Sequence, residues 1–148
     1  MSLPLKPGSI CRIRSLGKDP LVAHRLAEMG ILPGMEVSIV RIGPLGDPLE
    51  IATEFGQHIA LRTEEAASLD CEVVAAPLSA LPLDGKTPHR VHRLLGGRVF
   101  RERMAAAGLK EGTVFTAEGG PPFRLRLPEG RVIVLGRGEA EKVIVSRA

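Results

Sequence analysis

Short segments that alternate apolar and polar residues, bounded by Gly or Pro, dominate this sequence and predict β-strands. In the first half we expect strands at residues 10–14, 36–42, 49–55, 59–61 and 69–73. In the second half the pattern predicts strands at residues 113–118, 123–127, 131–135 and 142–145. About five short strands in about seventy residues are typical of a small β-barrel.

One short helix interrupts the strands in each half. Asp19-Pro20 predicts the start of the first helix, because Asp is a good N-cap and Pro favours the first helical position. Gly30 is expected to end it with a positive φ, and Pro33-Gly34 then turns the chain into the next strand. We therefore expect helices at residues 21–29 and 97–107, and a single helical turn at 63–67.

The segment around this turn occurs twice. Four residues recur 78 positions later: Arg25, Ala27, Gly30 and Gly34 as Arg103, Ala105, Gly108 and Gly112. Further on the offset is 74, as in Ile59-Ala60-Leu61 and Ile133-Val134-Leu135, and in Glu65-Ala66 and Glu139-Ala140. The Pro-rich lead-in Leu3-Pro4-Leu5 also recurs, as Leu81-Pro82-Leu83. Because the repeat has the length of a small domain, we predict a tandem duplication with domains at 1–77 and 78–148 and a short Pro/Ala-rich link over 75–82.

The charge is distributed unevenly between the halves. Residues 1–77 hold 7 Lys/Arg and 10 Asp/Glu, a net charge of −3, whereas residues 78–148 hold 13 and 7, a net charge of +6. The halves could attract one another, or the basic half could face an acidic partner.

The sequence also predicts the compartment. No apolar run is long enough to cross a bilayer, and the N-terminus lacks the pattern of a secretion signal. Cys11 and Cys71 form no CxxC pattern and lie in alternating stretches, so we expect buried, free thiols in a reducing compartment. These features predict a cytoplasmic protein.

Several motifs of the first half closely resemble those of the FeoA (ferrous iron transport protein A) family. They are Leu26-Ala27-Glu28-Met29-Gly30-Ile31-Leu32-Pro33-Gly34, Gly43-Pro44-Leu45-Gly46-Asp47-Pro48, Ala60-Leu61-Arg62 and Glu65-Ala66. The second half is similar but more diverged, and it lacks the Gly-Pro-Leu-Gly-Asp-Pro loop. The resemblance implies a mainly β fold of two SH3-like small β-barrels in tandem, each with one short helix.

The resemblance also implies a function. FeoA proteins are small cytosolic accessories of FeoB, the membrane ferrous iron transporter with a GTP-binding domain. We therefore expect this protein to bind and modulate a FeoB-type transporter, in the cytoplasm or peripherally at the inner face of the membrane. Similar domains lie at the end of iron- and manganese-responsive repressors, so a metal-ion-responsive regulatory domain is an alternative. We expect no winged-helix DNA-binding segment before this domain, which disfavours that alternative.

The candidate partner-binding residues lie in the first half. The loop Leu45-Gly46-Asp47-Pro48 places an apolar residue at a hairpin tip fixed by Pro and Gly, which suits docking to a protein groove. A plain tight connection is the alternative for the loop. Leu26 and Met29 of the helix are also candidates, with core packing as their alternative.

The sequence gives little support for catalysis or for a cofactor. It contains no GxSxG, no phosphate-binding loop and no HExxH, so we do not expect an enzyme. For a transition metal ion the only close pair is His89 and His92, which would point to opposite faces of a strand. We therefore expect no metal site and exposed histidines.

Nucleic-acid binding is the second class of function considered. Arginines make the second half basic, among them Arg90, Arg93, Arg98, Arg101, Arg103, Arg124, Arg126 and Arg131. Tyr and Trp are absent, so the chain lacks most of the side chains on which bases stack. We therefore do not expect nucleic acid as a partner; arginines along a continuous groove would favour it, and scattered arginines would not.

Overall fold

A computed structural model describes residues 6–148, so the expected repeat of Leu3-Pro4-Leu5 lies outside the described residues. The fold is mainly β, with two SH3-like small barrels in tandem. The chain divides into two compact units, residues 1–74 and 75–148, whereas the sequence suggested a boundary after residue 77. We call these units the first repeat and the second repeat.

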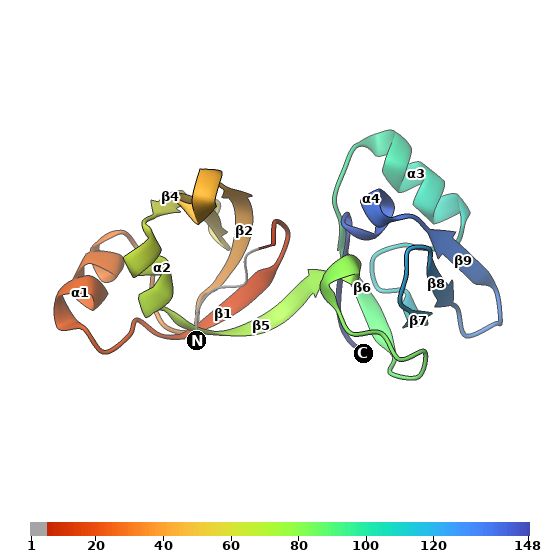
Figure 1. The fold of residues 1–148 in the computed structure, drawn as a ribbon, viewed down its shortest axis with the longest axis horizontal. Helices are drawn as coiled ribbons and strands as arrows, with labels where there is room; N and C mark the ends of the chain where they lie inside the picture. Colours follow the sequence, from red (N-terminus) through yellow and green to blue (C-terminus); the bar gives the residue numbers. More distant parts are fainter. Residues whose placement is uncertain (1–5) are drawn as a thin grey trace. The chain divides into compact units, whose positions relative to one another are not determined.

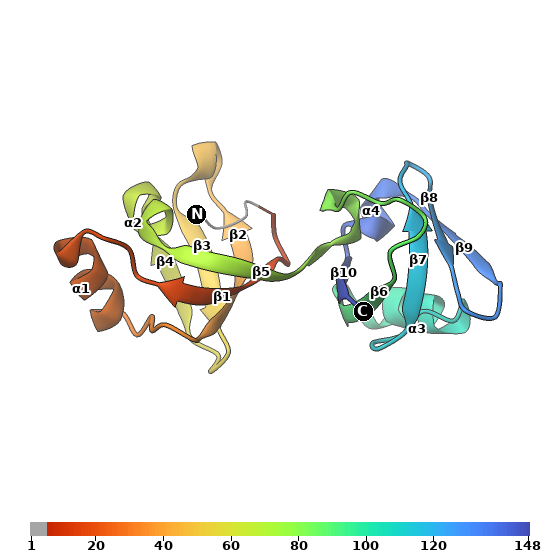
Figure 2. The ribbon, with the colours of Figure 1, turned by 90° about the horizontal axis from the view of Figure 1, so that it is seen from below.

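The first repeat is built on five antiparallel strands in the order β4-β3-β2-β1-β5 (Figure 1; β3 is labelled in Figure 2). Their bounds are β1 Ile10–Ser15, β2 Glu36–Ile42, β3 Leu49–Thr53, β4 His58–Leu61 and β5 Asp70–Pro77. Helix α1 (Pro20–Glu28) follows β1, the 3-10 turn η1 (Pro44–Gly46) joins β2 to β3, and helix α2 (Thr63–Ser68) precedes β5.

The second repeat has the same plan, with strand order β10-β6-β7-β8-β9 (Figure 2). Its strands are β6 His89–Leu94, β7 Val114–Glu118, β8 Phe123–Arg126, β9 Val132–Leu135 and β10 Val143–Arg147. Its helices are α3 Arg98–Ala106 and α4 Arg137–Ala140, preceded by the 3-10 turn η2 Leu78–Ala80. The end of β5 belongs to this repeat, because Ala76 and Pro77 pair with Val145 and Ile144 of β10.

The capping signals of the first helix are confirmed. The side chain of Asp19 accepts a hydrogen bond from the Leu21 N–H at 3.0 Å, and Pro20 occupies the first turn. Gly30 and Gly34 have φ values of 95° and 90°, a region that favours glycine because other side chains are strained there. These residues fix both the length of α1 and the direction in which β2 begins.

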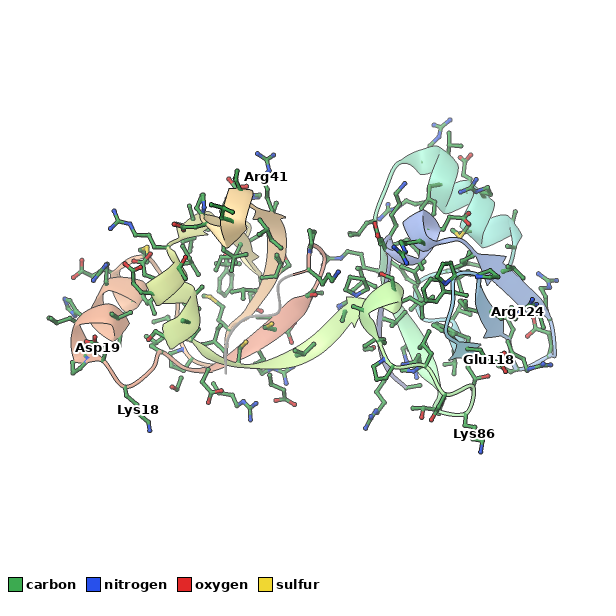
Figure 3. All side chains as sticks on the ribbon, viewed as in Figure 1. Lys18, Asp19, Arg41, Lys86, Glu118 and Arg124 are labelled. Carbon is green, nitrogen blue, oxygen red and sulfur yellow. The ribbon has the colours of Figure 1, made fainter. Side chains whose placement is uncertain are left out.

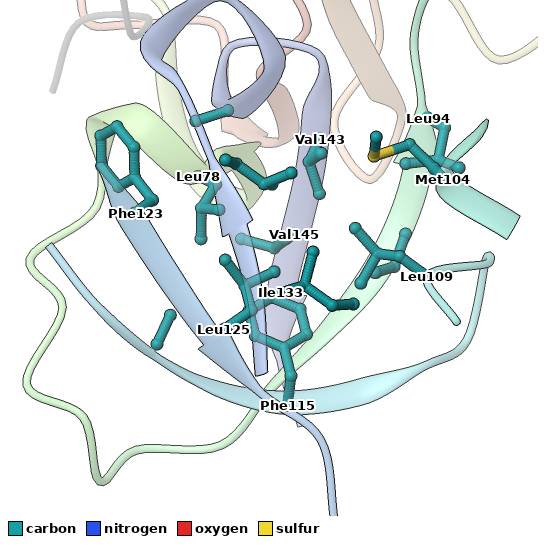
Figure 4. Packing of buried hydrophobic residues seen from close by; sticks show 14 of the residues in the cluster. Leu78, Leu94, Met104, Leu109, Phe115, Phe123, Leu125, Ile133, Val143 and Val145 are labelled. Atoms are coloured by element: carbon teal, nitrogen blue, oxygen red, sulfur yellow. The ribbon is translucent and has the colours of Figure 1, made fainter. Parts of the chain in front are cut away.

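Each repeat has its own apolar core. In the first repeat α1 contributes Leu26, which packs with residues of all five strands that include Cys11 and Cys71. In the second repeat α3 contributes Phe100 and Met104 to a core with Phe115 and Leu125 (Figure 4). Alternation places these apolar residues inside and the intervening polar residues outside, as the sequence predicts.

Three features differ from the sequence-based expectations. Strand β6 and helix α4 were not expected, because β6 is rich in His and Arg and α4 spans only one turn with a Gly at its centre. The expected link over 75–82 is structured in its first half, where β5 continues to Pro77. Leu78 then begins η2 and is fully buried in the second core.

The two repeats match in strand register. Glu50 pairs with Ala60 and Ala52 with His58 in the β3–β4 hairpin. Arg124 pairs with Val134 and Arg126 with Val132 in the β8–β9 hairpin. Each of these positions is separated from its counterpart by the offset of 74 found in the sequence, so the duplication is preserved in the structure.

Candidate functional site

The loop between β2 and β3 is closed by backbone hydrogen bonds. The Gly43 N–H donates to the Pro48 carbonyl at 2.9 Å, and the Gly46 N–H donates to the Gly43 carbonyl at 3.0 Å. A Cβ on Gly43 would lie 2.5 Å from the Asp47 carbonyl oxygen, so only glycine fits there. The loop is therefore a defined structure.

Leu45 stands at the tip of this loop and is fully exposed. Its φ of 60° and ψ of 21° place it in the left-handed region, and it is the one non-glycine residue with positive φ in the described part of the chain. This conformation costs an L-residue about 1 kcal/mol. Neither packing nor backbone preference explains a leucine at this position.

The other loop candidates accompany Leu45 at the surface. Asp47 and Pro48 are exposed and Gly46 is half-buried, with a φ of 84° at Gly46. The hairpin loop in the second repeat, Gly119 to Pro122, is exposed but carries no side chain comparable with Leu45. The apolar loop tip is thus a feature of the first repeat.

The structure separates the two helical candidates from the loop tip. Leu26 has no exposed surface and packs in the first core, which is the alternative given for it above. Met29 is half-buried and packs against the same core. Its role in partner binding stays a prediction.

A polar hollow of about 510 Å³ lies between the start of α1 and helix α2. It is lined in part by Lys18 and Asp19, labelled in Figure 3, and by Glu64 and Asp70. Within residues 6–148 no three His, Cys, Asp or Glu side chains are grouped so that they could hold a metal ion.

The histidine pair does not converge. Both residues lie on β6, where His92 is exposed and His89 is 8% exposed, so the expectation of an exposed His89 is wrong. The strand turns position 89 inward, where its ring lies 6.1 Å from that of Phe115. Burial and the nearby Arg147 lower the pKa of His89, and its Nδ1 has no hydrogen-bond partner among the described residues.

Cys11 and Cys71 are buried thiols and form no disulfide, as the sequence predicts. They lie on β1 and β5, which are neighbours in the sheet. A hydrogen bond to Cys71, together with burial, raises the pKa of Cys11. A protonated thiol is a poor nucleophile, so Cys11 serves the core.

The arginines of the second repeat are scattered over several elements. Arg98, Arg101 and Arg103 of α3 each lie within 4.0 Å of a glutamate carboxylate. Arg90 and Arg131 donate to backbone carbonyls. Five of the eight arginines named above thus have partners within the repeat.

A model of the FeoA domain matches residues 3–73 and, separately, residues 77–147. The chain belongs to the FeoA family. It consists of two FeoA domains, and the second has lost the apolar hairpin tip of the first. Among residues 6–148, no helix combines the length and apolar character needed to span a membrane.

Solved FeoA structures are similar to this chain. Iron(II) transport protein A from Clostridium thermocellum is 36% identical, and the match covers 100% of this chain and 88% of that protein with a TM-score of 0.49. FeoA from Stenotrophomonas maltophilia, an SH3 domain protein solved with zinc, is 30% identical over 49% of this chain and 89% of its own, with a TM-score of 0.43. Protein PA4359 from Pseudomonas aeruginosa is 36% identical over 49% of this chain and 97% of its own, with a TM-score of 0.39.

Proposed function

We propose that this tandem FeoA protein is an accessory of ferrous iron uptake that binds a FeoB-type membrane transporter and modulates its activity. The names of two similar proteins support a role in ferrous iron transport: the Clostridium thermocellum protein is called an iron(II) transport protein, and the Stenotrophomonas maltophilia protein a possible ferrous iron transport activating factor. The chain would act by binding rather than by catalysis, in the cytoplasm or at the inner face of the membrane.

The observation that carries the contact site is Leu45. Leu45 is fully exposed and lies at positive φ on a hydrogen-bonded loop. Because the loop is already ordered in the free protein, it loses little conformational entropy when a partner binds its apolar tip. Apolar side chains of this kind, inserted into a partner's pocket, dominate many protein interfaces. We assign the contact to the loop tip with its neighbours Gly46, Asp47 and Pro48.

The test is capture of the FeoB-type transporter of the same organism from detergent-solubilised membranes. The native chain should retain the transporter, and Leu45→Asp should lose at least about tenfold of the capture, because an apolar pocket rejects a carboxylate. Phe55→Asp is the matched control, since Phe55 is an exposed apolar residue (76%) in another hairpin turn of the same repeat. Equal capture by native chain and Leu45→Asp would exclude the loop as the contact.

A further inference from the structure

Equivalent hairpins of the two repeats carry different chemistry on their outward faces. In the first repeat the four outward positions of β3 and β4 are Glu50, Ala52, His58 and Ala60. In the second repeat the equivalent positions of β8 and β9 are Arg124, Arg126, Val132 and Val134, which we call the Arg/Val face. One acidic and three small or weakly polar residues are thus replaced by two cations and two β-branched apolar residues.

The arginines of the Arg/Val face are unpaired within the described part of the chain. Arg124 lies opposite Glu118 of β7 in the ladder, and Figure 3 labels both side chains. Their charged groups form no ion pair within 4.0 Å. The corresponding positions in the first repeat, Arg41 and Glu50, do form an ion pair at 3.6 Å. The guanidinium groups of Arg124 and Arg126 are therefore available for a partner.

The face is hollowed between these strands. A cavity of about 130 Å³ is lined by Thr116, Glu118, Arg124, Arg126 and Val132, and by Gly85 from the segment that bridges to β7. The hollow is open to the side chain of a partner and too small for a folded element. Its charged lining is two guanidiniums and the Glu118 carboxylate, a net charge of +1, which favours an anionic group such as the carboxylate of a peptide side chain.

Strand β9 is also an open edge. Within residues 6–148 it pairs with β8 alone. The Leu127 N–H donates to the Arg131 carbonyl at 2.8 Å, so in the alternating antiparallel ladder the N–H and C=O groups of Val132 and Val134 point to the free side. Both valines are exposed, at 44% and 51%, and the strand has neither a charge nor a proline to block pairing.

We propose that β9 accepts an extended acidic segment of another protein as an added strand. Main-chain hydrogen bonds to Val132 and Val134 supply affinity, and acidic side chains on the outward face of the added strand reach over the valines to Arg124 and Arg126. The residues that alternate with the acidic ones in the added strand lie on the same face of the sheet as Ile133 and Leu135. An alternation of apolar and acidic residues therefore fits best. In the first repeat β4 is an edge too, but Glu50 and Ala52 stand at the positions of Arg124 and Arg126, so its outward face lacks these two guanidinium groups.

The experiment titrates the full chain with the capped peptide Val-Glu-Val-Glu-Val-Glu-Val and follows backbone NMR signals. Signals of β8 and β9 should shift, and Arg124→Ala with Arg126→Ala should weaken binding by about tenfold or more. Val134→Pro should abolish binding, because proline removes an edge N–H while edge strands tolerate it. Ala60→Pro at the equivalent position of β4 is the matched control and should leave binding unchanged.

Other results would overturn the proposal. They include unchanged affinity for the peptide with Gln in place of Glu, and unchanged binding by a folded Val134→Pro chain. If Val134→Pro unfolds, the test uses two N-methylated peptides, each methylated at every second amide. In an added strand one of these two sets of amides faces β9, so one peptide must lose binding; unchanged binding by both would overturn the proposal. A dimer of the free chain that depends on β9 would assign the edge to a second copy.

Tighter binding of a short single-stranded RNA, with an affinity that Val134→Pro does not change, would assign the arginines to nucleic acid. The proposal is independent of transporter binding by Leu45.

Discussion

Leu45 and His89 are the two residues whose environment departs most from what their side chains prefer. Leu45 is apolar, fully exposed and held at positive φ. His89 is polar, buried and short of a partner for its Nδ1. Leu45 suits the docking role proposed above, and burial at position 89 favours the neutral form of the histidine.

His89 predicts a loss of stability in acid. Its pKa in the folded chain lies below the ordinary value of 6.5, so the unfolded chain takes up a proton first as the pH falls through about 6.5. The second repeat should therefore lose stability below that pH, by at most about 1.4 kcal/mol per pH unit, until the folded-state pKa is reached. Urea unfolding followed by NMR signals of the second repeat would measure it.

The matched variants for this prediction are His89→Gln and His92→Gln. The first removes the buried titrating group and should flatten the dependence on pH between about 5.5 and 7.5, whereas the second changes an exposed neighbour on the same strand and should not. An equally steep dependence in His89→Gln would assign the acid sensitivity to other groups.

At the scale of elements, each repeat uses one glutamate to tie its two helices together. The Arg62 N–H donates to Glu65 Oε1 at 2.8 Å, and Arg25 of α1 lies 3.5 Å from Glu65 Oε2. In the second repeat the Gly136 N–H donates to Glu139 Oε1 at 3.0 Å, and Arg103 of α3 lies 2.9 Å from Oε2. The carboxylate of Glu65 is more buried, with 6% of its side chain exposed against 32% for Glu139.

This difference predicts unequal costs of removing the carboxylate. Glu65→Ala should destabilise the first repeat by about 2–3 kcal/mol, because a buried charge-assisted network is left without its acceptor. Glu139→Ala should cost about 1 kcal/mol, since water replaces the partner there. The exposed neighbour Glu64→Ala is the control and should change the free energy of unfolding by less than about 0.5 kcal/mol. Equal costs at the two positions would contradict the role of burial.

The sequence predicts most of the helices and strands, but it misses strand β6. Asp19, Gly30 and Gly34 act through local backbone chemistry, so α1 and the turn into β2 could be predicted. Strand β6 could not, because a histidine occupies its core position and hides the apolar alternation. For Leu26 the sequence was compatible with both core packing and partner binding, because an apolar helix residue can do either. Only the structure shows that its neighbours are residues of the first core.

The same limit applies to the candidate sites. Pro44, Gly46 and Pro48 predict a fixed loop from local preferences alone, and Leu45 stands out among them. The Arg/Val face is different, because it depends on β9 having no second neighbour. Which strand ends a sheet is a property of long-range order, and no local pattern in residues 132–135 contains it.

At the scale of the whole molecule, the boundary between the repeats lies within a strand. Strand β5 begins in the first repeat and ends in the second, where Ala76 and Pro77 pair with β10. We infer that the second domain needs residues 75–77. The family match to the second domain begins at residue 77 and the sequence pattern at 78, so the start of an isolated domain is testable.

A fragment of residues 75–148 should therefore be more stable than one of 78–148, by about 1–3 kcal/mol for the lost ladder hydrogen bonds and buried apolar surface. Thermal unfolding of the two fragments, with their NMR spectra compared with that of the full chain, measures the difference. Equal stability would place the functional start of the domain after Pro77.

The two repeats also present different surfaces. The first keeps the apolar loop tip of Leu45, and the second replaces the equivalent of Glu50 and its neighbours with the Arg/Val face. We therefore expect the two repeats to contact different partners, or different parts of one partner. The first of these contacts carries the central claim.

The most direct measurement is ferrous iron uptake by cells whose chromosomal copy carries Leu45→Asp, with the amount of protein checked by immunoblot. Uptake should fall to the level of a strain that lacks the protein, because docking to the transporter is lost while the core is intact. Phe55→Asp should leave uptake at the native level. Native uptake with Leu45→Asp, at equal protein level, would contradict the account.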